Sequence, residues 1–456
     1  MKICAYVQDA YAKQNYSNEC MDKRQFVGLR VVVDCLERAG YTVDYAGRAS
    51  VHTYDVVLVS LTSDCDWWSF IRERRLWQRG DYKVLVGGAG VLHITPFLPW
   101  FYAVMFGRGE HLIVPLVVAI ERGDRWEHPS VAYADDFSED RIYRIAQVDE
   151  GYRHPVALTG GNQFCETTIG CNHKCLFCGY TWQRRFVSPH KTYQMDMALF
   201  GNIADRERAM LDMAQHMGAI DFSHLRTTAI DGFSERLRYG VNKKISRAMM
   251  REFLVAMMES DAAPHQLKFY NICGYPTESV DDWAEYLETL READATARGK
   301  DKQWSIVLHS TPFRPMPATP MACAPASKRN YRGLIGATLG KGLRGNIIFQ
   351  GKHLWSVESM GTDSLPTVML SMIAHRGSRE DSANIDKLCA NSKFWSASSA
   401  VKTATLEKYF DMDYLFGAFT PETLPSRYLR TYAEIEKMWG RTPLEKGENT
   451  NGNKAK

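Results

Sequence analysis

Short apolar runs alternate with longer amphipathic stretches along the first 125 residues of the chain. The runs KICAYVQ, YTVDYAG, DVVLVSL, KVLVGGA and AVMFGRG have the length of buried strands, and KRQFVGLRVVVDCLERAG has the periodicity of a helix. Strands that alternate with helices indicate a parallel sheet with helices on both faces. The pattern therefore predicts an α/β protein whose first domain, residues 1–125, is a doubly wound parallel sheet.

A second α/β region is expected over 161–325, after a polar and aromatic stretch, 126–160, that reads as a linker. Its strands are expected within GNQFCETTIG, LRTTAID, LKFYNICG and WSIVLHS, and its two helices within DMALFGNIADRERAMLDMAQHMG and SRAMMREFLVAMMES. From 326 the pattern changes to Gly-rich basic loops and then helices, so we expect a basic, mainly helical C-terminal domain over 326–440. The polar end, 441–456, has the composition of a disordered tail.

Composition narrows the class of protein. With 456 residues the chain is long enough for two or three domains, and 45% hydrophobic with 24% charged residues is ordinary for a globular protein. There is no run of 18 apolar residues, and the chain enters directly as a strand, so we expect a cytoplasmic protein without a membrane partner. Its 11 cysteines lack the spacing of a disulfide framework, which favours reduced thiols.

Three of these cysteines form one tight cluster. Cys171, Cys175 and Cys178 have the spacing CxxxCxxC within ETTIGCNHKCLFCGYTW. A structural zinc site uses four ligands, commonly from two separated pairs, and no second pair occurs here. Three thiolates suit a [4Fe-4S] cluster that leaves one iron open for a substrate or cofactor.

The cluster also resembles the signature CxxxCxΦC, with an aromatic residue at Φ, of the radical S-adenosylmethionine (radical SAM) superfamily. Phe177 occupies the Φ position between Cys175 and Cys178. The resemblance implies a central partial (β/α)6 barrel and a cluster at which SAM is cleaved reductively to methionine and a 5′-deoxyadenosyl radical. It also implies that Phe177 packs against the adenine of SAM, and that a reductant protein such as flavodoxin or ferredoxin is a partner.

Three later segments extend the resemblance. AIDGFSERLRYGVNKKIS is similar to GxESGSxxxLxxxxKxxT, FYNICGYPTESVDDW to a strand and turn written GLPGET, and FRPMPATPM to FxPxPGTP, which closes the barrel. The first match implies that Asp231, in place of the usual Glu, and Ser234 contact the ribose and methionine parts of SAM, and that Arg236 pairs with its carboxylate. The second implies that the backbone at Gly274 and Pro276 approaches the adenine.

The first domain resembles the cobalamin-binding Rossmann domain that precedes the barrel in one radical SAM class. The matching residues are Ser60, Gly87, Gly88, Gly107, Gly109 and Glu110. The DxHxxG motif that supplies an axial histidine in other cobalamin proteins is absent. The resemblance implies cobalamin as a second cofactor, although many such domains keep the fold without it.

A basic stretch follows the last barrel motif. After Asp301 no carboxylate occurs before Glu358, and bases, glycines and aromatic residues interleave in between. The basic candidates are Lys328, Arg329, Arg332, Lys341, Arg344 and Lys352. This composition is typical of surfaces that track phosphates and stack bases, and the other interpretation is a solvated basic surface. The stretch favours DNA, RNA or a nucleotide as the substrate.

Three functions remain open from the sequence. The leading hypothesis is a radical SAM enzyme, a transferase or isomerase, that modifies a nucleic-acid base or nucleotide by rearrangement or C-alkylation. The second is a cobalamin-dependent radical SAM C-methyltransferase for a small metabolite or peptide, and the third is a non-catalytic iron-sulfur or nucleic-acid-binding protein. Cys273 and Cys323 are candidate catalytic hydrogen donors, but single cysteines on barrel strands are more often core residues.

Overall fold

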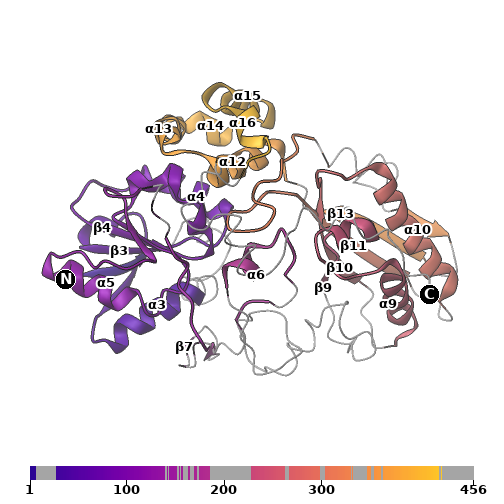
Figure 1. The fold of residues 1–456 in the computed structure, drawn as a ribbon, viewed down its shortest axis with the longest axis horizontal. Helices are drawn as coiled ribbons and strands as arrows, with labels where there is room; N and C mark the ends of the chain where they lie inside the picture. Colours follow the sequence, from indigo (N-terminus) through magenta and orange to yellow (C-terminus); the bar gives the residue numbers. More distant parts are fainter. Residues whose placement is uncertain are drawn as a thin grey trace.

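The computed structural model describes residues 1–6, 27–138, 141, 143–150, 152, 154, 156–157, 163–164, 169–171, 174–184, 227–261, 266–297, 303–329, 331, 347–350, 354–360, 363–420 and 423. Figure 1 shows two sheets at opposite ends of the molecule, with a group of C-terminal helices above the first one.

The first sheet has six strands in the order β2-β1-β3-β4-β5-β6. Its strands are β1 (Ile3–Tyr6), β2 (Val43–Ala46), β3 (Val56–Ser60), β4 (Lys83–Gly87), β5 (Ala103–Met105) and β6 (Val131–Tyr133). The first five are parallel and confirm the five predicted strands, whereas β6 pairs antiparallel with β5. The range 126–160, predicted as a linker, therefore supplies the edge strand of this sheet.

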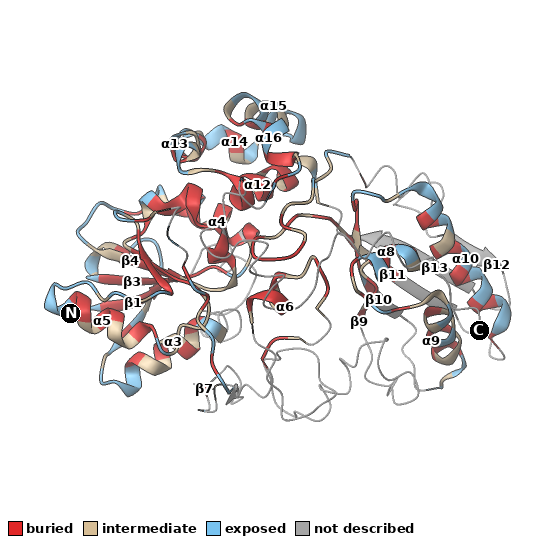
Figure 2. Cartoon of the chain, viewed as in Figure 1, coloured by how far each residue is buried: buried red, intermediate tan, exposed pale blue. Residues whose placement is uncertain are grey.

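Helices cover both faces of the first sheet. One face carries α3 (Val27–Arg38) and α5 (Ile113–Arg122), and the other carries α4 (Asp64–Arg74) with the 3-10 turns η2 (Ala89–His93) and η3 (Thr95–Trp100). Successive strand residues point to opposite faces, so a strand that is apolar throughout supplies both cores. Figure 2 shows the resulting buried layers on the two sides of β3 and β4.

The second sheet has five described strands in the order β12-β13-β11-β10-β9. These are β9 (Thr227–Ala229), β10 (Gln266–Cys273), β11 (Gln303–Pro312), β12 (Ile347–Gln350) and β13 (Leu354–Met360). All pairings are parallel except that of β12 with β13. The sheet thus continues beyond residue 325, where the sequence predicted its end, and the partial (β/α)6 barrel stays a prediction.

Two helices, α9 (Arg247–Glu259) and α10 (Val280–Thr296), pack on one face of the second sheet. Phe269, Cys273 and Leu308 point from the strands into this helix layer. Two short helices lie near the carboxyl ends of the strands, α6 (Gly179–Gln183) and α8 (Glu235–Gly240). A separate two-stranded pair is formed by β7 (Val156–Ala157) and β8 (Gln163–Phe164).

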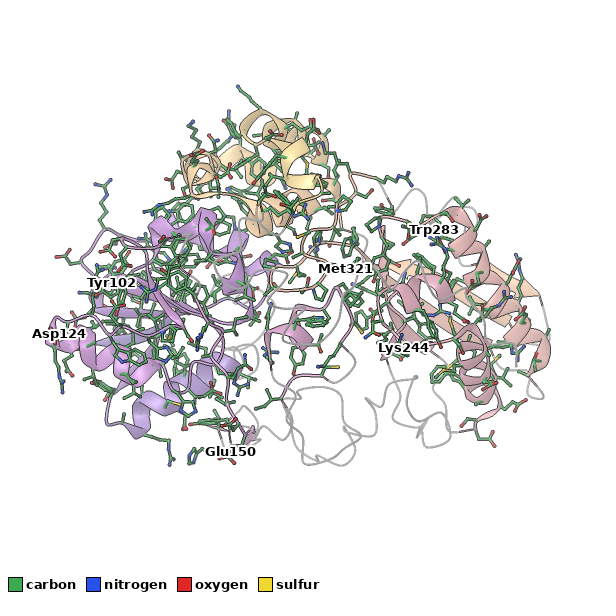
Figure 3. The ribbon with its side chains drawn as sticks, in the orientation of Figure 1. Tyr102, Asp124, Glu150, Lys244, Trp283 and Met321 are labelled. Carbon is green, nitrogen blue, oxygen red and sulfur yellow. The ribbon has the colours of Figure 1, made fainter. Side chains whose placement is uncertain are left out.

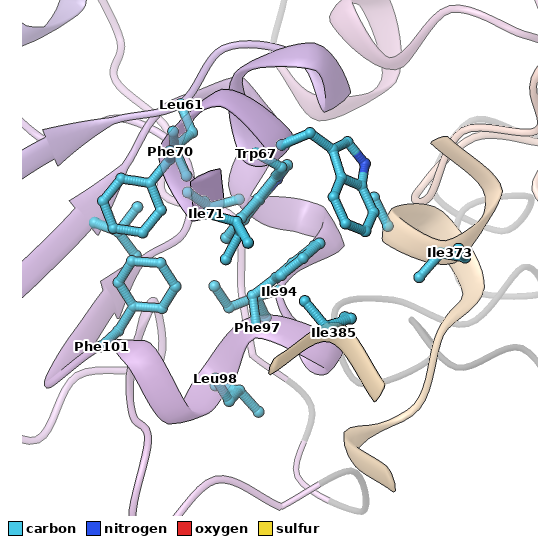
Figure 4. Packing of buried hydrophobic residues seen from close by; sticks show 14 of the residues in the cluster. Leu61, Trp67, Phe70, Ile71, Ile94, Phe97, Leu98, Phe101, Ile373 and Ile385 are labelled. Atoms are coloured by element: carbon cyan, nitrogen blue, oxygen red, sulfur yellow. The ribbon is translucent and has the colours of Figure 1, made fainter. Parts of the chain in front are cut away.

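The C-terminal helices share a core with the first sheet. They are α12 (Leu365–Arg376), α13 (Ser382–Ala390), α14 (Ser392–Ser396), α15 (Ser399–Tyr409) and α16 (Met412–Phe416), with a 3-10 turn η6 (Arg379–Asp381) between the first two. Trp67 stacks on Phe97 with ring centroids 4.2 Å apart, and Figure 4 shows Ile385 of α13 beside Phe97. The Trp68 indole N–H donates to the Leu370 carbonyl at 2.9 Å. The predicted tail, 441–456, lies outside the described residues.

A buried polar network joins the first domain, the second sheet and the C-terminal helices. The Asp64 carboxylate lies 3.2 Å from Arg314 Nη1 and 3.4 Å from His375 Nε2. Arg314 also donates to Ser371 Oγ at 3.0 Å and lies 3.4 Å from the Asp363 carboxylate. Burial alone raises the pKa of Asp64, but His375 and Arg314 outweigh burial and hold that pKa below its usual range.

None of the helices within the described ranges combines the length and the apolar character needed to cross a membrane.

Candidate functional site

The three clustered cysteines lie on one loop that leads into α6, called here the cysteine loop. The Cys178 N–H donates to the Cys175 carbonyl at 3.1 Å, which closes a tight turn. Side chains of α6 fold back on this turn, because Thr181 Oγ1 donates to the Cys171 carbonyl at 2.7 Å and Trp182 Nε1 donates to the Cys175 carbonyl at 2.8 Å. Hydrogen bonds at both ends therefore fix the backbone that presents the three thiols.

Two other segments hold the cysteine loop from outside. On one side the Leu176 N–H donates to the Val241 carbonyl at 2.9 Å, and Asn242 Nδ2 donates to the Lys174 carbonyl at 2.9 Å. On the other side the Met321 N–H donates to the Leu176 carbonyl at 3.2 Å. Met321 belongs to the segment after β11 and lies between the two sheets in Figure 3. The loop is thus clamped between the end of α8 and the segment that follows β11.

An aromatic stack, Phe177, Tyr275 and Phe313, places the loop at the carboxyl ends of β10 and β11. Tyr275 follows β10 and Phe313 follows β11, and their ring centroids are 5.2 Å apart. Phe177 lies 6.2 Å from the Tyr275 ring, and the Tyr275 hydroxyl donates to the Asp231 carbonyl at 3.0 Å. This edge is where parallel α/β sheets bind ligands. A contact between Phe177 and adenine stays a prediction.

A buried ion pair lies beside the cysteines. Lys243 Nζ is 3.1 Å from Asp231 Oδ2, and the two side chains are only 7% and 16% exposed. Asp231 has φ 51°, in the left-handed region that few non-glycine residues adopt. Burial raises the pKa of the Cys175 thiol, the Lys243 ammonium opposes this shift, and Asp231 adds to it. Sequence reasoning selected Asp231 but missed Lys243, although a lysine stands at this place in GxESGSxxxLxxxxKxxT.

Three cysteine thiols on one loop are a donor set that an iron-sulfur cluster can use. Within the described part of the chain, no group of three His, Cys, Asp or Glu residues converges as a single-ion site would require. A cubane cluster binds each cysteine through a different iron, so its three sulfurs need not converge on one point. Cys171, Cys175 and Cys178, one buried and two half-buried, would hold such a cluster beside the Lys243 ammonium.

Ser234 and Arg236 have protein partners on α10. Ser234 is buried at the N-terminus of α8, where its hydroxyl accepts the Leu237 N–H at 3.4 Å and donates to the Asp282 carboxylate. The Arg236 guanidinium pairs with Asp282 and donates to the Thr277 carbonyl at 2.7 Å. These contacts explain both residues without a ligand, and their contacts with SAM stay predictions.

The turn after β10 is built around a buried carboxyl group. Glu278 accepts the N–H groups of Gly274 at 2.8 Å and Tyr275 at 3.4 Å, and that of the Trp283 indole. Burial raises the pKa of Glu278 to about 7. Pro276 in the same turn is exposed, so it is open to a ligand.

The two candidate hydrogen donors have different surroundings. Cys273 is fully buried in the core between the second sheet and helices α9 and α10, the packing expected of a core residue. Cys323 is half-buried beside Ala322 and Phe419, in the segment that follows the cysteine-loop contact.

The face of the second sheet opposite α9 and α10 carries a polar aromatic pair that the sequence reasoning missed. Tyr270 is 41% exposed, and its ring meets the His309 ring edge to face with centroids 5.3 Å apart. The two residues are register partners on β10 and β11. Alternation along the strands was the available signal, because Phe269 and Leu308 next to them point into the helix layer.

Glycines that match the cobalamin pattern serve the packing of the first domain itself. A Cβ at Gly88 would lie 2.3 Å from the Leu61 carbonyl oxygen, and one at Gly107 would lie 2.5 Å from that of Ala146. Both residues also have positive φ, which glycine adopts without strain. The other matching residues have ordinary surroundings: Ser60 is buried, Gly87 and Gly109 face Met105 and Val32, and Glu110 pairs with Arg108. Cobalamin binding stays a prediction.

Most of the predicted basic surface lies outside the described residues. Lys328 and Arg329 are exposed, and Lys328 Nζ is 2.6 Å from the Asp413 carboxylate. Arg332, Lys341, Arg344 and Lys352 fall on residues that the structure does not describe. Nucleic-acid binding by this stretch stays a prediction.

No protein-family model and no curated protein sequence matches this chain.

Proposed function

We propose that this chain is a radical SAM enzyme that modifies an unactivated carbon of a nucleic-acid base or nucleotide, by rearrangement or C-alkylation. The proposal is carried by one observation, the cysteine loop clamped at the carboxyl ends of β10 and β11 beside the aromatic stack. When bound there, a [4Fe-4S] cluster and SAM would supply a 5′-deoxyadenosyl radical that takes hydrogen from such a carbon.

The chain's own groups have separable tasks in this proposal. Cys171, Cys175 and Cys178 hold the metal centre, and the hydrogen bonds from Thr181 and Trp182 fix their backbone. The aromatic stack covers the loop with apolar surface, which keeps water from a reactive intermediate. The protein thus positions and shields the centre, and the cofactors carry the bond cleavage.

Tyr270 and His309 support a planar substrate. They lie side by side on the sheet face that α9 and α10 leave uncovered, and Tyr270 exposes much of its ring. Exposed aromatic rings stack on nucleobases, and an imidazole adds a hydrogen-bonding group at the edge. A base in a duplex would have to be flipped out or presented single-stranded to reach them.

The first test is cluster assembly. We expect anaerobically reconstituted protein to bind iron and sulfide, and Cys175→Ala to bind neither in stoichiometric amount. Cys35→Ala is the matched control, because Cys35 is half-buried in the first domain, far along the chain from the cysteine loop. Equal iron content in all three proteins would refute the assignment of the metal centre.

The second test concerns the substrate class. We expect 5′-deoxyadenosine formation to rise on addition of nucleosides or single-stranded oligonucleotides, and the protein to bind heparin at low salt. Stimulation by peptides or small metabolites instead would refute the substrate class while leaving the reaction type intact. A cluster that forms without any deoxyadenosine would indicate the non-catalytic iron-sulfur protein.

A further inference from the structure

Backbone contacts at the end of α8 hold the Lys243–Asp231 pair beside the cysteine loop. Asp231 stands in the left-handed region, and Lys243 follows the two residues that hold the cysteine loop, Val241 and Asn242. The Lys243 N–H donates to the Arg238 carbonyl at 2.7 Å, which anchors the lysine at the end of α8. The backbone that clamps the loop thus also delivers a buried ammonium group to it.

Burying this ion pair has a free-energy cost. Removing two charges from water costs several kcal/mol per ion. The pair therefore has to serve something beyond packing, because well-packed apolar residues often stabilise a fold as well as a buried ion pair does. A fixed charge at Lys243 lies next to the cysteine loop, because Val241 and Asn242, the two residues before it, hydrogen-bond Leu176 and Lys174 on either side of Cys175.

We infer that Lys243 is a positioning residue that sets the reduction potential of the iron-sulfur cluster, with Asp231 moderating its charge. This inference rests on the proposed function. Reduction adds one electron to a centre that three thiolates already make negative, so a buried cation beside it stabilises the reduced form. An electron donor such as dithionite supplies the electron, and the cysteine ligation does not change.

The two charges predict opposite effects. Lys243→Met keeps the length of the side chain but removes the positive charge, so the reduced form loses stabilisation and the potential becomes more negative. Asp231→Asn removes the negative charge and keeps a residue type that tolerates positive φ, so the potential becomes less negative. A purely structural role for the pair would lower stability in both variants without this reversal of sign.

The test is a redox titration, followed by absorbance and electron paramagnetic resonance, of reconstituted wild-type protein and variants without SAM. Lys244→Met is the matched control, because Lys244 is exposed and lies 5.2 Å from the Tyr239 ring centre. We expect a tenfold or larger change in the ratio of reduced to oxidised cluster for Lys243→Met, which is 59 mV for one electron. We expect an opposite shift for Asp231→Asn and no shift for Lys244→Met.

Potentials that do not move, or that move in the same direction in both variants, would overturn the inference while the proposed function stands. If Lys243→Met does not retain a cluster, Lys243→Arg and Asp231→Asn are compared instead. A wild-type potential for Lys243→Arg together with a less negative potential for Asp231→Asn supports the inference. Any other result overturns it. Wild-type protein that assembles no cluster would overturn the proposed function and this inference with it.

Discussion

Replacement of Arg376 by methionine tests whether the C-terminal helices and the cysteine loop form one cooperative unit. The Arg376 guanidinium is buried and donates to the carbonyls of Leu415 at 3.0 Å, Gly417 at 2.6 Å and Ala322 at 2.9 Å, and also to that of Ala324. Burial lowers its pKa to about 10, so it stays charged at neutral pH. It ties α12 to α16 and to the segment whose neighbour, Met321, bonds the cysteine loop.

The magnitude follows from the groups left behind. Methionine fills part of the volume but leaves four carbonyl oxygens without their donor, and each buried unsatisfied group costs about 1–3 kcal/mol. Water reaches some of these oxygens after local rearrangement, so we expect a loss of about 3–5 kcal/mol in local stability, as when one partner of a buried charge is removed. At about 1.4 kcal/mol per factor of ten, amide exchange in this unit accelerates at least a hundredfold.

Hydrogen exchange read by mass spectrometry measures this effect segment by segment. We expect faster exchange in peptides that cover 365–376, 412–420 and 174–184, and little change in peptides from β1 and β3. Arg379→Met is the control, because Arg379 is exposed and the one described hydrogen bond of its side chain is a donation to the Ala134 carbonyl at 3.4 Å. Protection within threefold of the wild type in Arg376→Met would refute the coupling.

Three further predictions follow from the polar groups. Asp64→Asn lowers the melting temperature at pH 7. The difference from wild type shrinks as the pH falls below about 4, because Asp64 then takes up a proton in the unfolded chain, whereas its lowered pKa keeps it ionised in the folded protein. An equal difference at pH 3 and pH 7 would contradict the network. The pKa of Glu278 is raised to about 7, so the free energy of unfolding of the wild type falls by up to about 3 kcal/mol as the pH rises from 4.5 through 7. Glu278→Gln therefore shows a weaker pH dependence of this free energy in denaturant titrations. An unchanged pH dependence would contradict the raised pKa. Tyr270→Ala changes the free energy of unfolding by at most about 0.5 kcal/mol because Tyr270 is exposed. It weakens binding of a nucleoside substrate about tenfold through the loss of stacking. A nucleoside affinity equal to that of the wild type would remove Tyr270 from the site.

The first sheet was predictable from the chain because three of its strands, β1, β3 and β5, are buried at every position. Val56 to Ser60 is buried at every position, and this apolar run predicts a strand covered on both faces. β6 was missed because it is only three residues long and sits in a polar stretch. β12 and β13 were missed because they interrupt glycine-rich basic loops, where charge rather than hydrophobic pattern dominates the local signal.

The site was predictable only where its residues are close in sequence. The cysteine spacing indicated the loop, and the motif around Asp231 indicated a second segment of the site, although its contacts with SAM stay predictions. The motif GxESGSxxxLxxxxKxxT singles out Lys243 from the adjacent Lys244, but only the fold shows that Lys243 is buried and Lys244 exposed. The Asp64–Arg314–His375 network joins Asp64 to residues 250 and 311 positions later in the chain and depends on the arrangement of three regions, which no local pattern encodes.

Formation of 5′-deoxyadenosine by the reconstituted, reduced protein is the direct test that this chain cleaves SAM reductively. The protein is incubated anaerobically with SAM and dithionite, and the product is quantified by mass spectrometry beside Cys175→Ala and Cys35→Ala. We expect 5′-deoxyadenosine from the wild type and from Cys35→Ala, and none above background from Cys175→Ala. Equal product from all three proteins, or none from a wild type that holds its full complement of iron and sulfide, would contradict this expectation.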